Sequence, residues 1–407
     1  MFRNSRCLRG YLLFFYLQHM KRYFTLFLLN FIGAALFAQK VNFQDFAIQT
    51  LDSIYVKFGS PKNQLLAEKY PFDENFKADY LDNQQQAGQQ KKYAYLWPFS
   101  GSFSAVNALM ELPKTKKAFQ FILDKKVLVG LQEYRDESRS PVGYASYLNT
   151  APPSDRFYDD NIWLGIDFTD SFIHTRKANY LTSAKEIWNF VKSGEDDKLG
   201  GGIYWCEQKK ESKNTCSNAP ASVFALKLFM ATNDKSYLQE GERLYAWTKR
   251  NLQDPEDKLY WDNIQLNGKI GKAKFSYNAG QMLQAAALLY KLTKNKQYLE
   301  DAQQLAEACL GYFFEKSGEL SFPKLKNSNL WFHAVMMRGY MELAAVNGNQ
   351  KYLAIFAENL EFAWKHMRDK EGLFSPDWTL KDQHQSKWLL DQCAFVEMYA
   401  RLAKAGY

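Results

Sequence analysis

Histidine and cysteine, from which many protein metal sites are built, are scarce in this chain. There are five of each among 407 residues. The histidines beyond residue 38 show no spacing typical of metal ligands, such as two histidines four positions apart. We therefore expect no metal ion, and the sequence indicates no other cofactor. These histidines are His174, His333, His366 and His384.

A hydrophobic run long enough to span a membrane is also missing, because such a helix needs about 20 apolar residues. The apolar run Tyr23–Phe37 follows the basic triplet Met20–Arg22 and precedes the small residue Ala38. A basic start, a short apolar run and a small residue are typical of a signal peptide. We expect Met20 to be the true start, residues 1–19 to be an upstream extension, and cleavage to follow Ala38.

This segment predicts export, to the periplasm or the extracellular space, with no stable membrane insertion once the signal is removed. The catalytic domain would then be residues 39–407. The full chain has a formal net charge of +8, but residues 1–38 carry five basic side chains and no acid, which leaves +3 for the rest. Because no basic patch is present, the sequence does not indicate binding to nucleic acid.

The four cysteines beyond residue 38 lie in two kinds of setting. Cys206 and Cys216 flank one polar loop, and an exported protein can form a disulfide there. The sequence leaves a disulfide and two free thiols equally open. Cys309 and Cys393 lie in apolar helical stretches, where we expect buried thiols.

Aromatic residues are plentiful by contrast, with 31 Phe, 25 Tyr and 10 Trp. Part of this set must belong to a hydrophobic core. Aromatic faces also provide stacking surfaces for sugar rings. The excess therefore favours, mildly, a cleft that binds a glycan.

An internal repeat organises the chain. Amphipathic helices open around Tyr180, Tyr237, Tyr298 and Tyr352, which are 57, 61 and 54 residues apart. Each is followed by a loop and then by a more apolar helix rich in Ala, Leu and Met. The amphipathic helices are predicted to start near residues 43, 116, 178, 235, 296 and 350, and the apolar helices near 100, 160, 218, 278, 330 and 388.

Six helices of each kind in alternation predict an all-α fold, a single (α/α)6 toroid of six inner and six outer helices. The last inner helix, Lys387–Ala403, should close the ring against the first outer helix, Phe43–Phe58. Length alone would allow two domains, but the repeat indicates one closed domain. Strand signals are sparse, and we expect strands only in short loop hairpins such as Gly202–Cys206.

The inner helices of such a toroid run parallel, so their N-termini should meet at one end of the barrel. Polar and aromatic residues concentrate at these starts. Helix capping explains individual Asn and Asp residues, but it does not explain their aromatic companions. The segments expected to line one cleft are Trp97–Gly101, Tyr158–Asn161, Ser217–Pro220, Tyr277–Gly280, Asn329–His333 and Trp388–Gln392.

Two adjacent carboxylates, Asp159 and Asp160, open the second inner helix within the segment Tyr158–Trp163. Retaining glycoside hydrolysis uses two carboxyl groups about 5–5.5 Å apart, one as nucleophile and one as acid/base. Neighbouring side chains that diverge can supply this separation. A simple helix cap is the alternative, because acids are favoured in the first turn. The convergence of helix starts favours a catalytic pair.

The segment Tyr158–Trp163 and several further segments together resemble glycoside hydrolase family 76. The resemblance covers roughly residues 43–405. The resemblance implies an (α/α)6 fold and endo-acting α-1,6-mannanase activity. It implies that Asp159 is the nucleophile and Asp160 the acid/base, with retention of anomeric configuration. The charged loop Glu207–Glu211 departs from typical members, which puts the subsites beside it in question. The segments that carry the resemblance are Tyr158–Trp163, Gly200–Trp205, Lys213–Asn218, Tyr277–Gly280 and Leu389–Gln392.

Elementary electrostatics suits these implied roles. Backbone N–H groups and the dipole at the helix start should keep Asp159 ionised. The pKa of Asp160 must rise, through the charge of Asp159 and burial against Tyr158 or Trp163, for it to carry a proton. Once Asp159 becomes a glycosyl ester it loses its charge, so Asp160 becomes more acidic and can act as a base towards water.

Further residues at or near the helix starts are candidates for substrate binding, each with a structural alternative. Aromatic candidates could stack on mannose rings or pack in the core. Asparagines could bind sugar hydroxyls or cap helices, and an aspartate could orient a polar contact or simply suit a first turn. The candidates are Trp97, Tyr158, Asn161, Tyr204, Trp205, Asn218, Tyr277, Asn278 and Asp391.

The sequence thus predicts a secreted, retaining endo-α-1,6-mannanase that acts on α-mannan polysaccharide or oligosaccharide, as a monomer and without a cofactor. A transglycosylase would use the same aspartates with a sugar hydroxyl in place of water. A non-catalytic glycan-binding toroid suits the aromatic content, but the aspartate pair counts against it. A sugar epimerase would need histidine as proton carrier, and only His333 lies at an inner-helix start.

Overall fold

The structure is a computed structural model, and its compact unit is Phe43–Tyr407. The predicted upstream extension, signal peptide and cleavage site lie outside the described residues. None of the helices within the described ranges is long and apolar enough to cross a membrane. The structure describes residues 41–73, 76, 78, 92–316, 318, 320–382 and 386–407.

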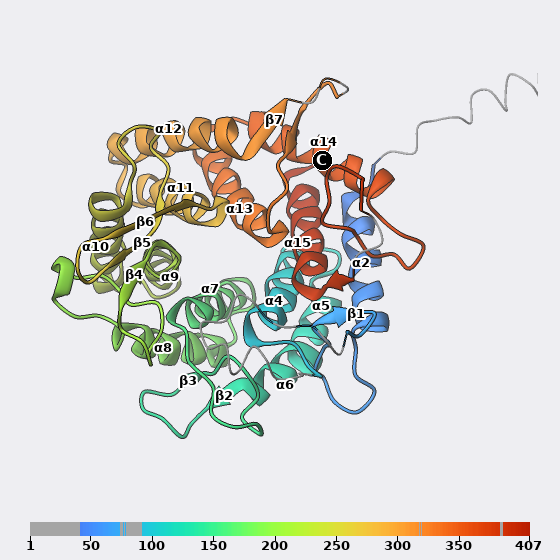
Figure 1. Cartoon of the computed structure of the whole chain (residues 1–407), viewed down its shortest axis with the longest axis horizontal. Coiled ribbons are helices and arrows are strands. Elements are labelled where there is room, and N and C mark those ends of the chain that lie inside the picture. Colours follow the sequence, from blue (N-terminus) through green and yellow to red (C-terminus); the bar gives the residue numbers. More distant parts are fainter. Residues whose placement is uncertain are drawn as a thin grey trace, which may run out of the picture. The chain divides into compact units, whose positions relative to one another are not determined.

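In the described part of the chain, six mostly buried helices form an inner ring (Figure 1). Each contacts the next in chain order, and the last contacts the first, so the ring is closed. The inner helices are α4 (Leu96–Met110), α7 (Tyr158–Thr175), α9 (Thr215–Thr232), α11 (Ser276–Thr293), α13 (Leu330–Asn347) and α15 (Leu389–Ala405).

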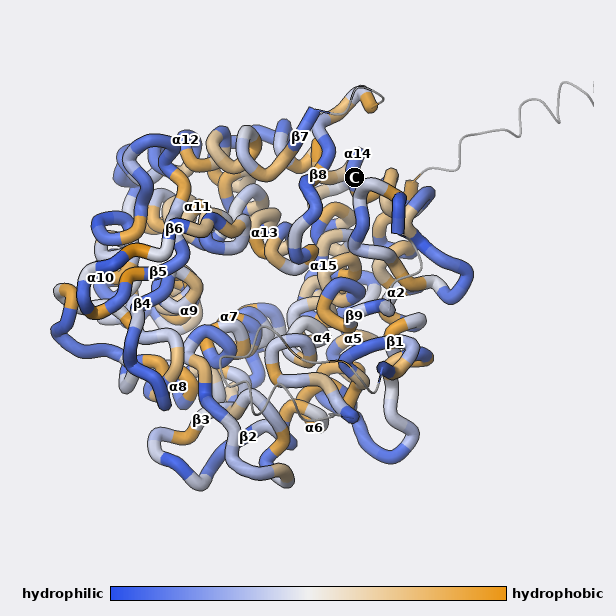
Figure 2. The backbone as a smooth tube through the Cα atoms, viewed as in Figure 1, coloured by the Kyte–Doolittle hydropathy of each residue, from blue (hydrophilic) through white to orange (hydrophobic). Residues whose placement is uncertain are grey.

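An outer set of helices surrounds this ring, and each has one buried face. In the outer helix Lys235–Leu252, the buried residues recur at the helical spacing of an apolar stripe. They include Gly241, Leu244, Tyr245, Thr248 and Leu252. Hydrophilic residues gather in the peripheral loops (Figure 2). The outer helices are α2 (Phe43–Lys57), α5 (Lys116–Ile122) continued by the π-helical η1 (Leu123–Val127) and α6 (Leu128–Leu131), α8 (Ala178–Lys192), α10 (Lys235–Leu252), α12 (Lys296–Phe313) and α14 (Lys351–His366).

The predicted (α/α)6 toroid is therefore confirmed. Observed helix starts lie within four residues of the predicted ones. The largest difference is in α4, which begins at Leu96 rather than near 100 because Pro98 is accommodated in the first turn, where a missing N–H costs nothing. The last inner helix, α15, packs against the first outer helix, α2, as predicted.

The strands among the described residues are short and pair antiparallel. The largest sheet has three of them, and its middle strand brings polar side chains to the pocket described below. One two-stranded pair joins a segment before the first inner helix to the start of the last one. The strands are β1 (Lys69–Tyr70) with β9 (Lys387–Trp388), β2 (Arg135–Asp136) with β3 (Gly143–Tyr144), β4 (Ser212–Asn214) with β5 (Trp261–Gln265) and β6 (Ile270–Lys274), and β7 (Phe314–Lys316) with β8 (Pro323–Leu325).

The hairpin predicted at Gly202–Cys206 is reduced to isolated bridges, one of which pairs Tyr204 with Lys213. Gly200, Gly201 and Gly202 have φ angles of 70°, 105° and 84°. Glycine adopts this left-handed backbone readily, and three such residues in succession prevent a continuous strand.

Candidate active site

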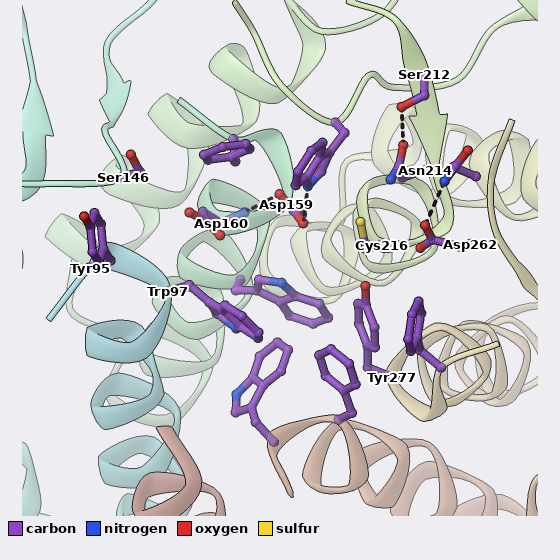
Figure 3. Close-up of a pocket in the computed structure, with 17 residues that line it drawn as sticks. Tyr95, Trp97, Ser146, Asp159, Asp160, Ser212, Asn214, Cys216, Asp262 and Tyr277 are labelled. Carbon is purple, nitrogen blue, oxygen red and sulfur yellow. Dashed lines mark hydrogen bonds between the residues drawn. The ribbon is translucent and has the colours of Figure 1, made fainter. Parts of the chain in front are cut away.

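A pocket of about 360 Å³ opens where the inner helices begin (Figure 3). Its volume is in the range of small-molecule sites. Five inner helices contribute side chains from their first two turns, as parallel packing predicts. These side chains are Trp97 from α4, Asp159, Asp160 and Trp163 from α7, Cys216 from α9, Tyr277 from α11, and Trp331 and Phe332 from α13.

Hydrogen-bond donors surround the carboxyl group of Asp159. The indole N–H of Trp205 donates to Asp159 Oδ2 at 3.1 Å, and the backbone N–H of Asp160 donates to Oδ1 at 3.1 Å. The thiol of Cys216 also lines the pocket and lowers the Asp159 pKa as a further donor. Burial raises the pKa of Asp159, and these donors oppose the rise because each stabilises the anion.

Asp160 has a different environment although it is the next residue. Burial and the charge of Asp159 both raise its pKa well above the usual range. A proton shared by this coupled pair is therefore favoured on Asp160, and the negative charge on Asp159. The expected rise of the Asp160 pKa is found, and the pocket raises that of Asp159 as well because it removes the carboxyl from water.

Aromatic rings from several inner helices cover one side of the pocket (Figure 3). Phe332 stacks on Tyr277 with ring centroids 4.0 Å apart. Trp331 meets Trp97 edge-on at 5.6 Å and Trp163 at 4.9 Å. The rings brace one another and present a rigid apolar surface, which suits the face of a sugar ring.

A third carboxylate, Asp262, reaches the pocket from β5. Asn263 Nδ2 donates to its Oδ2 at 2.7 Å, and burial raises its pKa. Asn214 and Ser212 of β4 lie beside it in the pocket wall, with a 2.7 Å hydrogen bond between them. Sequence reasoning missed this polar wall because it lies on strands rather than at a helix start. The aromatic-acid-amide run Tyr260–Asn263 was the available signal.

Cys216 was also missed as a pocket residue. It is the second residue of α9, as Asp159 is of α7 and Tyr277 is of α11. These three positions are 57 and 61 residues apart, which are the intervals of the repeat itself. Aligning the repeats in register would have placed Cys216 beside Asp159.

Five of the predicted site residues line the pocket, namely Asp159, Asp160, Trp97, Trp205 and Tyr277. The remaining candidates do not belong to its lining. They pack in the core, bind backbone or are buried nearby.

Tyr158 and Tyr204 pack in the core. Tyr158 is fully buried, stacked on Phe190 at 4.9 Å, because the first residue of α7 directs its ring towards α8. Tyr204 is buried, and its hydroxyl donates to Asp196 Oδ2 at 2.7 Å.

Asn161 and Asn218 bind backbone. Asn161 Oδ1 accepts from Tyr144 N at 2.7 Å, and its Nδ2 donates to Tyr144 O at 2.9 Å. Asn218 makes the same pair of bonds with Ile203, at 2.7 and 2.9 Å. Each is the fourth residue of its inner helix, so the repeat uses this position to attach an extended segment of the chain.

Asn278 and Asp391 are buried outside the pocket. Asn278 approaches the Asp262 carboxyl. Burial raises the pKa of Asp391 to about 7, against the charge of Lys69 and a hydrogen bond from the backbone of Leu330.

His333 is also buried outside the pocket, with both ring nitrogens in hydrogen bonds. Its Nε2 donates to Lys326 O at 3.0 Å, so its Nδ1 accepts from Ser276 Oγ at 3.1 Å. Burial lowers its pKa to about 4. This neutral, fully bonded ring does not suit the proton carrier of an epimerase.

The described cysteines are free and buried, including Cys206 and Cys216, so the structure contains no bond between these two. The charged loop that follows Cys206 is anchored by the buried Arg156, whose Nε donates to Glu207 Oε2 at 2.7 Å. In the described ranges, no group of three or more His, Cys, Asp or Glu side chains could hold a metal ion.

A toroid with a carboxylate pair in an aromatic pocket at its inner-helix starts is the arrangement of a glycoside hydrolase. The model of glycosyl hydrolase family 76 matches residues 69–405, and the chain belongs to this family.

Three relatives illustrate the range of similarity. The structure of the family 76 mannosidase Bt3792 from Bacteroides thetaiotaomicron is 30% identical with a TM-score of 0.81, over 90% of this chain and 99% of that one. A meiotically up-regulated protein of Schizosaccharomyces pombe is 28% identical over 253 residues, 54% of this chain and 56% of that protein. A mannan endo-1,6-alpha-mannosidase of Candida glabrata is 26% identical over 144 residues, 33% of this chain and 32% of that protein. The chain thus spans about half or less of the curated relatives' length.

Proposed function

We propose that the protein is an exported, retaining endo-α-1,6-mannanase, with residues 39–407 as its catalytic domain. The observation that carries this proposal is the unequal environment of Asp159 and Asp160. Family membership supports hydrolysis of a glycoside. The names of the Bacteroides mannosidase and the Candida mannan endo-1,6-alpha-mannosidase support the substrate, an α-mannan polysaccharide or oligosaccharide.

In the first step, the protonated Asp160 gives its proton to the glycosidic oxygen while the anionic Asp159 attacks the anomeric carbon. The bond from that carbon to the leaving oxygen breaks, and a glycosyl ester to Asp159 forms. The leaving sugar departs as a neutral alcohol. The indole of Trp205 keeps Asp159 ionised and oriented for attack.

In the second step, Asp160 acts as the base. The ester on Asp159 is neutral, so the charge that raised the pKa of Asp160 is gone and the carboxyl remains ionised. It takes a proton from water as the water oxygen attacks the anomeric carbon and the ester breaks. Two inversions give net retention, and both aspartates return to their starting states.

The rest of the pocket would bind the sugar. The rings of Trp97, Tyr277 and Phe332 offer an apolar face to a pyranose ring. Asp262 and Asn263 offer acceptors and a donor to the hydroxyl groups at its edge.

The test is an anomeric NMR time course on linear α-1,6-mannan with the wild type, Asp159→Asn and Asp160→Asn. We expect the α-anomer first, and a loss of rate of about 10²–10⁴-fold in Asp160→Asn. Asp197→Asn, which removes an exposed acid outside the pocket, should keep the wild-type rate.

A second substrate separates the two roles. The fluoride of α-1,6-mannobiose needs no protonated leaving group, so Asp160→Asn should still form the glycosyl-enzyme from it, whereas Asp159→Asn should not. The β-anomer as first product would contradict the nucleophile role of Asp159. Longer chains as the only products would show transglycosylation, and no products with folded protein would reject the mannanase proposal.

A further inference from the structure

We propose that Cys216 is a positioning residue, whose thiol, supported by the hydroxyl of Tyr277, orients the Asp159 carboxylate for attack on the sugar. The inference rests on the proposed nucleophile role of Asp159 and deepens it. It gives a function to a buried side chain that the mechanism otherwise treats only as pocket lining.

The repeat architecture creates this contact. Asp159, Cys216 and Tyr277 are each the second residue of their helices, α7, α9 and α11. These helices are neighbours in the inner ring, so the same position on each brings the three side chains together. Figure 3 shows the Cys216 sulfur between the Asp159 carboxyl and the Tyr277 hydroxyl.

The three groups act on one another in one direction. The Tyr277 hydroxyl lowers the pKa of Cys216 and the Cys216 thiol lowers that of Asp159, as a donor beside each group does. Burial and the charges of Asp159 and Asp262 raise the pKa of Cys216 well above its usual range, and burial does the same for Tyr277. Both therefore remain protonated donors, and the chain of bonds ends on the carboxylate.

A thiol suits this position because it is a weak donor. A hydrogen bond to the anion is lost in part when Asp159 becomes an ester, so a strong donor would stabilise the ground state against reaction. The thiol instead fixes the rotamer of Asp159 at little cost to its reactivity. The side chain is 3% exposed, so water does not compete for the bond.

The experiment compares Cys216→Ala, Cys216→Ser and Tyr277→Phe with the wild type and with Cys309→Ala, which removes a buried thiol from the outer helix α12. The Asp159 carboxyl is titrated by NMR in protein labelled with ¹³C at aspartate Cγ, without substrate, using Asp159→Asn for assignment. The acid limb of kcat/KM on α-1,6-mannan is then measured for each variant.

We expect Cys216→Ala to raise the Asp159 titration midpoint by about 0.5–1 pH unit, because the anion loses a donor. Cys216→Ser should restore most of the shift, Tyr277→Phe should give a smaller rise, and Cys309→Ala none. The acid limb of kcat/KM should move by the same amounts.

An unchanged midpoint in Cys216→Ala would overturn the proposal. A serine variant shifted as far as the alanine variant would also overturn it, because it would show that the thiol only fills space. Tyr277→Phe gives an independent arm if Cys216→Ala does not fold. The titration needs no substrate, so it decides this inference even if wild-type protein leaves α-1,6-mannan intact, a result that would reject the proposed function instead.

Discussion

Adjacent residues acquire different chemistry in this pocket. Asp159 and Asp160 share a helix start, yet the donors on Asp159 favour its ionised form, and its charge then favours the protonated form of Asp160. Asp262 adds a third acid on the opposite side of Cys216 in Figure 3. We expect Asp262, together with its partner Asn263, to hydrogen-bond substrate hydroxyls.

Asp262→Asn tests this role. A hydrogen bond to a charged group is worth about 1.5–3 kcal/mol, so we expect kcat/KM on α-1,6-mannan oligosaccharides to fall by about 10–100-fold with unchanged thermal stability. The matched control is Asp257→Asn, which removes a partly exposed acid paired with Lys274 next to the same hairpin. It should change kcat/KM less than about twofold. Equal effects of the two substitutions would argue against a substrate contact.

Helix packing sets the position of the pocket wall. The inner helices α11 and α13 approach closely at Gly280 and Gly339, where a Cβ on Gly280 would lie 2.3 Å from Met336 Cα. The same helices carry Tyr277, Trp331 and Phe332 at their starts, so their separation decides where three of the pocket rings lie.

Gly280→Ala should therefore lower the free energy of unfolding by about 1–3 kcal/mol through overpacking, and it should lower kcat/KM because the rings move. Gly311→Ala is the matched control on the outer helix α12, where nothing lies within 4 Å of the added Cβ. It should be neutral or stabilise by up to about 1 kcal/mol. Urea denaturation measures both variants, and a stable Gly280→Ala would show that the two helices can separate freely.

Closure of the whole ring buries charged groups between its inner helices. Arg338 of α13 donates to both oxygens of Glu397 of α15, at 2.6 and 2.8 Å. Between another pair of inner helices, Ser104 of α4 donates to Asp167 of α7 at 2.6 Å. Burial raises the pKa of Asp167 to about 7, against the charge of Arg338. Burial would raise that of Glu397 too, but Arg338 and Arg401 lower it to about 2.

These shifts have opposite effects on stability. Asp167 binds a proton more tightly in the native state than in the unfolded chain. Its contribution to the stability of the native state is therefore present below about pH 4 and is lost as the pH rises through about 7. Asp167→Asn should therefore stabilise the protein relative to the wild type at pH 8 more than at pH 4. Urea denaturation at pH 4, 6 and 8 measures this difference.

Glu397→Gln provides the contrast. The Glu397 pKa is lowered, so its contribution is present above about pH 4.5 and is lost as the pH falls towards 2. At pH 7 we expect the free energy of unfolding of this variant to fall by about 3–5 kcal/mol, because Arg338 is left as a buried charge with one partner fewer.

A pH-independent difference in stability between Asp167→Asn and wild type would show that Asp167 does not change protonation in this range.

Much of this architecture was predictable because it depends on local patterns. Hydrophobic periodicity marked the alternating helices, and their parallel packing brought Trp97, Asp159 and Tyr277 to one end. The same reasoning placed Asn161 and Asn218 at that end, but not their contacts. Both bind the backbone of an extended segment, and no local signal distinguishes that contact from a sugar hydroxyl.

The sequence by itself determined the toroid and the adjacent carboxylates, since these follow from helical periodicity and from neighbours along the chain. Only the tertiary structure decided that Asp262 enters the pocket, that Cys216 lies there beside Asp159, that Tyr158 and Asp391 stay outside, and that burial raises the pKa of Asp159 as well as that of Asp160. The reason is physical. Burial, hydrogen bonds and pKa shifts depend on segments far apart in the chain, and these meet only when the ring has closed.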